Sequence, residues 1–397
     1  MTDFAATRSQ FHLPDGTVYL DGNSLGPMPR AARARLDQTI AAEWGDMLIT
    51  GWNKAGWMDQ PARLGDRIGR LIGAEPGHTV LGDTLSVKVY QALAAALALR
   101  PERKVILSDS GNFPSDLYMA QGLIRAMGGT HELRIVAPEE VEAAITYEVA
   151  VTMLTEVDYR TGRRHDMPHL TAKAHSVGAL ALWDLAHSAG AFPVDVSGGK
   201  ADFAVGCTYK FLNGGPGAPA FIYVAPEHAE VVEPALAGWL GHDAPFAFEP
   251  AYRPAPGIAR MRVGTPPVLQ MAALETALDV WDQVDMPALD EARIALSEQF
   301  IAEVAQHAPM LELASPRDPA ARGAQVSFRF TEGYAAIQAL IARRVIGDFR
   351  APDIMRFGIT PLYLSSEDIS RAASEIGTVI SERLWDTPEY RRKAAVT

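Results

Sequence analysis

The 397-residue sequence predicts an α/β fold with a mostly parallel sheet, followed by a smaller α+β domain. Short apolar runs alternate with longer segments of helical periodicity through the middle of the chain, which is the pattern of successive β–α units. The apolar runs are nearly continuous, so their strands are expected to be covered on both faces of the sheet. From about Pro266 the pattern changes to long amphipathic segments, which predicts a second domain.

Individual elements follow from these patterns. The runs predicted to form strands of the first domain cover residues 104–111, 148–157, 179–188, 202–212 and 218–225. The segments predicted to form its helices cover residues 84–97, 116–129 and 169–178. In the second domain, helices are expected over residues 269–284, 289–307 and 365–385, with a strand over residues 324–330.

Composition limits the possible partners and location. The formal net charge of −12 and the pI of about 5.3 argue against a nucleic-acid-binding protein, which would carry a basic patch. The single cysteine, Cys207, excludes an intrachain disulfide and fits a reducing cytoplasm. The N-terminal residues contain no apolar signal region, and the longest run of small apolar residues, 92–99, is too short to span a bilayer. We therefore expect a cytoplasmic protein without a membrane or nucleic-acid partner.

Polar groups follow several of the predicted strands. Asp116 comes after the first strand, Asp184 and His187 end the third, and Lys210 lies at the end of the fourth, before a turn rich in glycine and proline. Ligands of open α/β sheets bind outside the carboxyl ends of the strands. Lysine is rarely buried unless it is paired. If these strands are neighbours, the carboxylates, the imidazole and the amine converge and shift one another's pKa values.

This combination favours pyridoxal phosphate (PLP) chemistry. A lysine forms a Schiff base with the cofactor's aldehyde, and an acidic side chain keeps the pyridine nitrogen protonated so that the ring accepts electrons. Thr84 and Ser86 open a strongly helical run, and a helix start of this kind can bind the phosphate. Taken singly, the same residues have ordinary explanations: Lys210 as a solvated strand end, and Asp184 with His187 as a helix cap and a core histidine.

Seven segments of the chain resemble the kynureninase family of PLP enzymes. They are YLDGNSLGPMP (19–29), FPSD (113–116), DLAHSAG (184–190), TYKFLNGGPGAPAF (208–221), GWLGH (238–242), GTPPVL (264–269) and RAPDIMRFGITPLY (350–363). Each is weak alone, but their joint order along nearly the whole chain is specific. The resemblance implies PLP-dependent transferase fold type I, with a seven-stranded sheet. It also implies three segments: residues 1–50 packing with the small domain, a large PLP-binding domain at 51–265, and a small C-terminal domain at 266–397.

The resemblance also implies roles for individual residues. Lys210 is the Schiff-base lysine, Asp184 pairs with the pyridinium nitrogen, and Tyr209 shares proton transfer with Lys210. The other implied cofactor contacts are Leu85, Ser86, Phe113, Asp116, Thr155, His187, Trp239 and Thr265, the last pair coming from the neighbouring subunit of a homodimer. The implied substrate contacts are Arg356 at the α-carboxylate, held bidentately, together with Ser24, Trp52 and Thr265. No metal is implied.

The implied reaction is hydrolysis of L-kynurenine to anthranilate and L-alanine by cleavage of the Cβ–Cγ bond, a step of tryptophan breakdown that also feeds NAD biosynthesis. Members that favour the 3-hydroxylated substrate resemble one another in carrying histidine and asparagine at two positions facing the substrate ring. Here those positions hold Trp52 and Thr265. An indole has no hydrogen-bond acceptor, so a preference for L-kynurenine is expected.

Two local patterns suggest other chemistry. GNSLG (22–26) matches the nucleophile elbow of serine hydrolases, which needs a helix directly after the serine. Pro27 and Pro29 favour a loop instead. His165 and His169 are spaced like metal ligands on a helix, but a proline lies between them and no cluster of further ligands completes a site.

Two other functions stay open on the sequence. One is another enzyme of the same fold, an aminotransferase or a cysteine desulfurase; Cys207 would have to be an exposed thiolate for the latter, yet it lies in an apolar run. The other is a PLP-binding protein without catalytic activity, which would not need a carboxylate-binding arginine such as Arg356.

Overall fold

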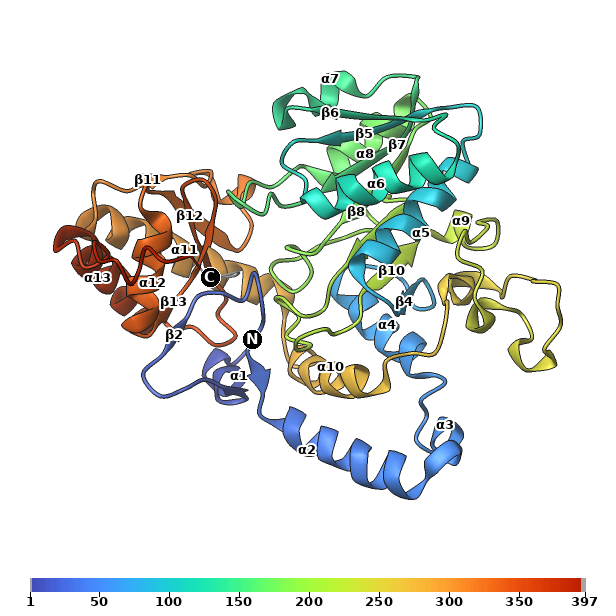
Figure 1. Cartoon of the computed structure of the whole chain (residues 1–397), viewed down its shortest axis with the longest axis horizontal. Coiled ribbons are helices and arrows are strands. Elements are labelled where there is room, and N and C mark those ends of the chain that lie inside the picture. Colours follow the sequence, from blue (N-terminus) through green and yellow to red (C-terminus); the bar gives the residue numbers. More distant parts are fainter. Residues whose placement is uncertain (1, 394–397) are drawn as a thin grey trace.

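The computed structural model describes residues 2–393, and its larger unit is built on a seven-stranded sheet (Figure 1). The strand order is β4-β10-β9-β8-β7-β5-β6. The strands are β4 (Thr79–Leu81), β5 (Val105–Asp109), β6 (Glu132–Val136), β7 (Val149–Thr155), β8 (Leu180–Asp184), β9 (Phe203–Gly206) and β10 (Phe221–Val224). Only β10 runs antiparallel to its neighbours. The predicted mostly parallel α/β fold is therefore confirmed.

Helices cover both faces of this sheet. α5 (Leu85–Ala98) and α6 (Pro114–Ala126) share one core with Ile106 and Val205. α4 (Gln60–Leu71), α8 (Met167–Ser176) and α10 (Val268–Trp281) share the core on the opposite face. Both faces of the strands are consequently buried, which explains why the strands read as continuous apolar runs.

The strand predicted over residues 202–212 is shorter than expected. It ends at Gly206, and the residues that follow form turns closed by Asn213 N donating to Lys210 O at 2.9 Å and Gly214 N donating to Thr208 O at 2.8 Å. Lys210 therefore lies four residues beyond the strand and not at its last position. The apolar run continued because the turn is buried as deeply as the strand, and hydrophobicity alone does not distinguish the two.

The smaller unit places a four-stranded antiparallel sheet against helices. The strand order is β11 (Glu312–Leu313), β12 (Gln325–Arg329), β15 (Ile354–Gly358) and β14 (Asp348–Arg350). Its helices are α11 (Met286–His307), α12 (Gly333–Ala342) and α13 (Ser366–Ser381). The predicted strand over residues 324–330 and the predicted helices occur, whereas the sequence analysis predicted neither β14 nor β15.

The N-terminal segment connects the two units. β2 (Val18–Tyr19) pairs in parallel with β13 (Val345–Ile346) of the smaller unit, and the loop after β2 continues toward the larger unit, where Gly26 N donates to Tyr209 O at 2.8 Å. This pairing brings residues 21–24 beside β14. The proposed bounds of the three segments stay a prediction, and their outermost residues, 1 and 394–397, lie outside the described part of the chain.

Two segments project from the rest of the structure (Figure 1), and both carry large exposed apolar side chains. The first, which we call the N-terminal arm, runs from α2 (Ala31–Gln38) through a π-helical turn (Thr39–Asp46) to α3 (Gly51–Lys54). Its exposed residues are Ile40, Trp44, Leu48 and Ile49, and those of the second projection, residues 239–257, are Trp239, Phe246 and Phe248. No helix within residues 2–393 is long and apolar enough to cross a membrane.

Lys88 of α5 is fully buried. Its Nζ donates to Gln91 Oε1 at 2.9 Å, to Met261 O at 3.0 Å and to Asp83 Oδ2 at 3.3 Å. Burial lowers the pKa of Lys88 to about 8, although the carboxylate of Asp83 opposes the shift; Arg262 lowers it slightly further. Keeping Lys88 charged in the folded protein therefore lowers the free energy of unfolding.

This cost predicts a pH-dependent stability. Below about pH 8, Lys88 is protonated in the folded and unfolded states, and the cost is complete. From there to the ordinary lysine value of 10.5, the unfolded chain keeps a proton that the folded chain releases, so the free energy of unfolding rises with pH. Relative to Lys88→Met, the wild type should gain on the order of 3 kcal/mol over this range.

Urea unfolding of both proteins between pH 7 and pH 10 measures this difference. Lys104→Met, at an exposed lysine, serves as the control and should show no such trend relative to wild type. If the difference between wild type and Lys88→Met is the same at every pH, Lys88 does not titrate in the folded state as described.

Candidate active site

A cavity of about 150 Å³ lies beyond the carboxyl ends of β7 and β8, between the two units. It is lined by Asn23, Ser24, Leu85, Phe113, Thr155, Tyr159, Asp184, Ala186, His187, Tyr209, Lys210, Arg350 and Arg356. Nine of these are residues that the sequence singled out, and they come from positions 24 to 356 of the chain. The strand order explains why several of these residues lie together, because β7, β8 and β9 are consecutive neighbours in the sheet.

Lys210 contacts His187 inside the cavity. The Nζ atom of Lys210 lies 3.0 Å from His187 Nε2. Burial and the cationic charges of Lys210, Arg356 and Arg350 hold the pKa of His187 well below its usual range. His187 is therefore neutral and accepts a hydrogen bond from Lys210, which leaves its buried Nδ1 without a partner in the described residues. A bound ligand could satisfy that atom.

Asp184 and Asp116 form a buried carboxyl pair behind Lys210. Asp184 ends β8, and its Oδ1 accepts from Ala186 N at 2.8 Å. Burial and the charge of Asp184 raise the pKa of Asp116 well above its usual range. Burial also raises the pKa of Asp184, but Lys210, the Ala186 N–H and a hydrogen bond from Asp116 oppose the shift. Asp116 is therefore protonated at neutral pH, and it does not itself line the cavity, whereas Lys210 and the Ala186 N–H favour the ionised form of Asp184.

Two helix N-termini meet at one end of the cavity. α5 begins at Leu85 after Thr84, whose side chain forms no capping hydrogen bond, and α6 begins after Phe113. Ser86 of α5 and Ser115 of α6 are joined by a hydroxyl–hydroxyl hydrogen bond of 3.0 Å. The first N–H groups of a helix have no partner within the helix and attract anions. This end of the cavity can therefore bind a phosphate.

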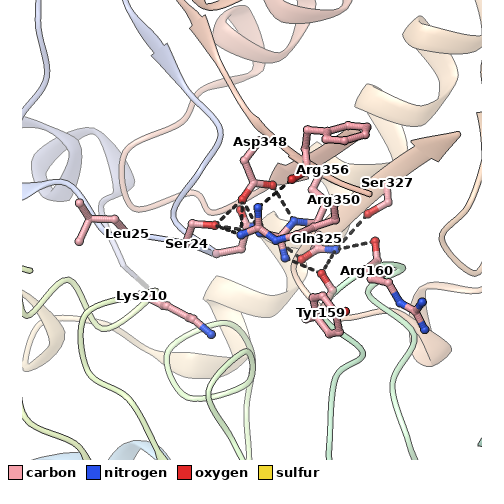
Figure 2. Close-up of polar contacts among 12 residues, drawn as sticks. Ser24, Leu25, Tyr159, Arg160, Lys210, Gln325, Ser327, Asp348, Arg350 and Arg356 are labelled. Carbon is pink, nitrogen blue, oxygen red and sulfur yellow. Dashed lines mark hydrogen bonds and ion pairs between the residues drawn. The ribbon is translucent and has the colours of Figure 1, made fainter. Parts of the chain in front are cut away.

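Arg356 enters from the opposite side, on β15. It is almost completely buried, and Figure 2 shows its side chain surrounded by protein acceptors. Nε donates to Asp348 Oδ1 at 2.6 Å, and Nη2 donates to Asp348 Oδ2 and, at 2.9 Å, to Ser24 Oγ. Nη1 donates to Tyr159 O at 2.5 Å. Four of the five N–H groups of the guanidinium are thus occupied, so Arg356 has only one left for a substrate.

Sequence reasoning missed several residues of this network. Asp348 and Arg350 alternate with Phe349 on β14, and two-residue spacing places them on one face of the strand. That alternation was the only available signal, because the pairing of β14 with β15 cannot be read from three residues. Tyr159 follows β7 in a loop that Gln325 holds by donating to Tyr159 O and Arg160 O, both at 3.1 Å.

Three predicted site residues lie away from the cavity of their own chain. Trp52 is half-buried on the N-terminal arm and packs edge-on against Trp57, with ring centroids 5.5 Å apart. Trp239 is 42% exposed and packs against Phe246 on the second projection. Thr265 is exposed. The resemblance assigns Trp239 and Thr265 to a neighbouring subunit, and their positions leave that assignment a prediction.

The motifs that suggested other chemistry do not form the corresponding sites among the described residues. Residues 22–26 form a loop, as the two prolines predicted, and the helix that a nucleophile elbow needs directly after its serine is missing after Ser24. His165 pairs with buried Asp109 at 2.6 Å, whereas exposed His169 pairs with Glu142 at 3.1 Å, so the two histidines serve different carboxylates. Cys207 is buried, and burial raises the pKa of its thiol.

The residues of the cavity fit PLP. An amine, a buried carboxyl group and an anion-binding helix start are the groups that such a cofactor needs. Phe113 offers a partly exposed ring at the cavity wall, where it packs edge-on to Tyr159 with centroids 5.1 Å apart. The unpartnered Nδ1 of His187 is a further polar atom that a bound ring substituent could satisfy.

Comparison with known sequences points to one family. The family model for the kynureninase C-terminal domain matches residues 289–376. A protein named Kynureninase from Burkholderia pseudomallei (strain 1106a) is 50% identical over 400 residues, covering 99% of this chain and 96% of its own. A protein of the same name from Pseudomonas fluorescens is 49% identical with the same coverage.

Solved structures share the fold at low identity. The apo cysteine desulfurase of Thermococcus onnurineus NA1 has a TM-score of 0.79 at 16% identity, covering 95% of this chain and 98% of that one. The cysteine desulfurase CsdA of Escherichia coli has a TM-score of 0.79 at 18% identity, covering 96% and 99%. A C-DES mutant with glycine linked to its PLP cofactor has a TM-score of 0.76 at 19% identity, covering 93% and 98%. At these identities the likeness shows the fold alone.

Proposed function

The chain belongs to the kynureninase family, and from this premise we propose that it hydrolyses L-kynurenine to anthranilate and L-alanine with PLP as its cofactor. The observation that carries the proposal is the cavity in which Lys210 and the Asp184–Asp116 pair of the larger unit face Arg356 of the smaller one. The cavity therefore places a candidate cofactor-binding lysine and carboxyl pair opposite a candidate carboxylate-binding arginine. The buried thiol of Cys207 argues against the desulfurase alternative, which needs an exposed thiolate.

Four parts of the cavity would hold the cofactor. Lys210 would bind it covalently, Asp184 would accept the N–H of its pyridinium ring, the start of α5 at Leu85 and Ser86 would bind its phosphate, and Phe113 would stack on the ring. PLP, when bound, withdraws electrons from the α-carbon of an amino acid. Lys210 and the Ala186 N–H favour the ionised form of Asp184, which would place a negative charge opposite the ring nitrogen.

Proton transfer in the proposed reaction would depend on Lys210, His187 and Tyr209. The neutral imidazole of His187 accepts from Lys210 Nζ and orients that amine in the cavity. Once free, Nζ can remove the proton from the substrate's α-carbon. The neighbouring Cys207 and burial raise the pKa of Tyr209, so its hydroxyl stays protonated at neutral pH and can donate. Thr155, whose hydroxyl donates to Val157 O at 3.2 Å, lines the cavity as a further cofactor contact.

A homodimer with shared active sites is part of this proposal. The exposed aromatic and aliphatic side chains of the N-terminal arm and of residues 239–257 form apolar surface that a second copy could cover. Trp52, Trp239 and Thr265 lie on or beside these projections, from which they would reach the partner's cavity. We also propose that the enzyme acts in the cytoplasm, in tryptophan breakdown and the supply of NAD precursors.

A product assay tests the function. Purified protein with PLP and L-kynurenine should release fluorescent anthranilate and L-alanine in equal amounts. An aminotransferase would yield a keto acid instead, a desulfurase would release sulfide from cysteine, and a non-catalytic binder would show cofactor absorbance without turnover. Any of these three results, with no anthranilate formed, would reject the proposal.

Substrate preference supplies a finer prediction. We expect a higher specificity constant for L-kynurenine than for 3-hydroxykynurenine, because the indole of Trp52 has no hydrogen-bond acceptor and would fill the space that the extra hydroxyl needs. A desolvated hydroxyl without a partner costs about 1–3 kcal/mol, or roughly 5- to 150-fold. The double variant Trp52→His with Thr265→Asn should shift the ratio toward the hydroxylated substrate.

The measurement is the ratio of kcat/KM for the two substrates in each protein. Trp44→His, on the same arm and 58% exposed, is the control and should leave the ratio unchanged. Equal constants in the wild type, or a double variant with the wild-type ratio, would show that these positions do not select the substrate.

A further inference from the structure

Arg350 lines the cavity and uses fewer of its guanidinium donors than Arg356 does. Its Nη1 donates to Phe349 O at 2.8 Å, and its Nη2 contacts Asp348 Oδ2 at 2.9 Å and Ser24 Oγ at 3.4 Å. A guanidinium has five N–H groups, so Arg350 keeps two that no described residue accepts, including its Nε–H. Its side chain is 34% exposed, compared with 2% for Arg356, and both residues line the cavity.

The charges around Arg350 do not balance without a ligand. Among residues 2–393, Asp348 is the one carboxylate that contacts both Arg350 and Arg356. Burial, and then the charge of Asp348, raise the pKa of nearby Asp21 to about 8. Asp21 is therefore mostly protonated at neutral pH. Two guanidinium cations share a single anion, and one further negative charge would complete the cluster.

Ser24 joins the two arginines. Its hydroxyl donates to Asp348 Oδ2 at 2.5 Å and accepts from Arg356 Nη2 at 2.9 Å and Arg350 Nη2 at 3.4 Å. Figure 2 shows this cluster on one side of the cavity and Lys210 on the other. An amino acid whose amine lies at Lys210 could extend its carboxylate toward both arginines.

We propose that Arg350 is a second anchor for the substrate's α-carboxylate, which Arg350 and Arg356 bind together. This inference rests on the proposed function, and it revises the expectation of a bidentate grip by Arg356 alone. Arg356 contributes its one remaining Nη1 hydrogen, and Arg350 contributes its free donors. Asp348 is a positioning residue that aligns both guanidinium groups.

The test measures how much the carboxylate of an amino acid contributes to its binding. L-Alanine, the product, and ethylamine share an amine and a methyl group, but ethylamine lacks the carboxylate. Dissociation constants of both are measured for the PLP-loaded enzyme from changes in cofactor absorbance, alongside KM for L-kynurenine. Loss of a charge-assisted contact should weaken L-alanine binding by about 10- to 100-fold in Arg350→Gln, with ethylamine binding unchanged. Arg350→Lys, which keeps the charge, should fall between this variant and wild type.

Arg160→Gln is the matched control. Arg160 lies next to the cavity wall, over the ring of Tyr159 at 5.6 Å, but it does not line the cavity, so its removal tests the effect of losing a nearby charge. The proposal is overturned if Arg350→Gln leaves the alanine-to-ethylamine ratio unchanged, or if Arg160→Gln lowers it equally. Anthranilate formation by the wild type tests the proposed function separately, so failure of one does not imply failure of the other.

Discussion

Lys210→Ala is expected to abolish turnover of L-kynurenine. The substitution removes the amine that would bind the cofactor and also carry the α-proton. Loss of a proton carrier alone costs up to about 10⁴-fold, and no other lysine lines the cavity. The variant should also lose the absorbance of covalently bound PLP while it keeps its fold, since Lys210 lies in a turn held by backbone hydrogen bonds.

Chemical labelling identifies the lysine independently of activity. Borohydride reduction of the wild type should fix PLP to Lys210, which peptide mapping would reveal. Lys200→Ala, at an exposed lysine, is the control and should keep both turnover and labelling. A pyridoxyl group found on another of the chain's lysines would show that the site has been assigned to the wrong residue; those lysines are Lys54, Lys88, Lys104, Lys173, Lys200 and Lys393.

Asp184→Asn should bind PLP but lose more than about 100-fold in turnover, which is roughly 3 kcal/mol of transition-state stabilisation. The amide carries no charge, so the pyridine nitrogen would no longer be held protonated and the cofactor would accept electrons poorly. The measurements are kcat/KM and the PLP content of the purified variant. Near-normal turnover would make Asp184 a structural residue.

Asp116→Asn is the matched control for this experiment. Asp116 is protonated, and an asparagine amide can replace its carboxyl group beside Asp184 without adding charge. We therefore expect this variant to lose far less activity than Asp184→Asn. Equal losses in the two variants would mean that the carboxyl pair acts as a unit and that Asp184 is not the only charge required.

At the ends of the strands, local sequence patterns were sufficient to place Asp184 but not Lys210. The apolar runs located all five central strands, and Asp184 lies at the end of β8 as its position in the run predicted. Lys210 was placed at a strand end but lies in a buried turn beyond β9. Its place in the cavity was still predictable, because the turn starts at the same edge of the sheet as the strand end.

The sequence by itself determined the α/β class, the helices and the residue types available for catalysis, because hydrophobic periodicity and strand-end residues are local properties. Only the tertiary structure decided which of these groups meet. Ser24 and Arg356 are 332 positions apart and share a hydrogen bond, and Asp348 reaches Arg356 because β14 pairs with β15. The number of donors that Arg356 has left depends on such contacts, and no pattern along the chain encodes them.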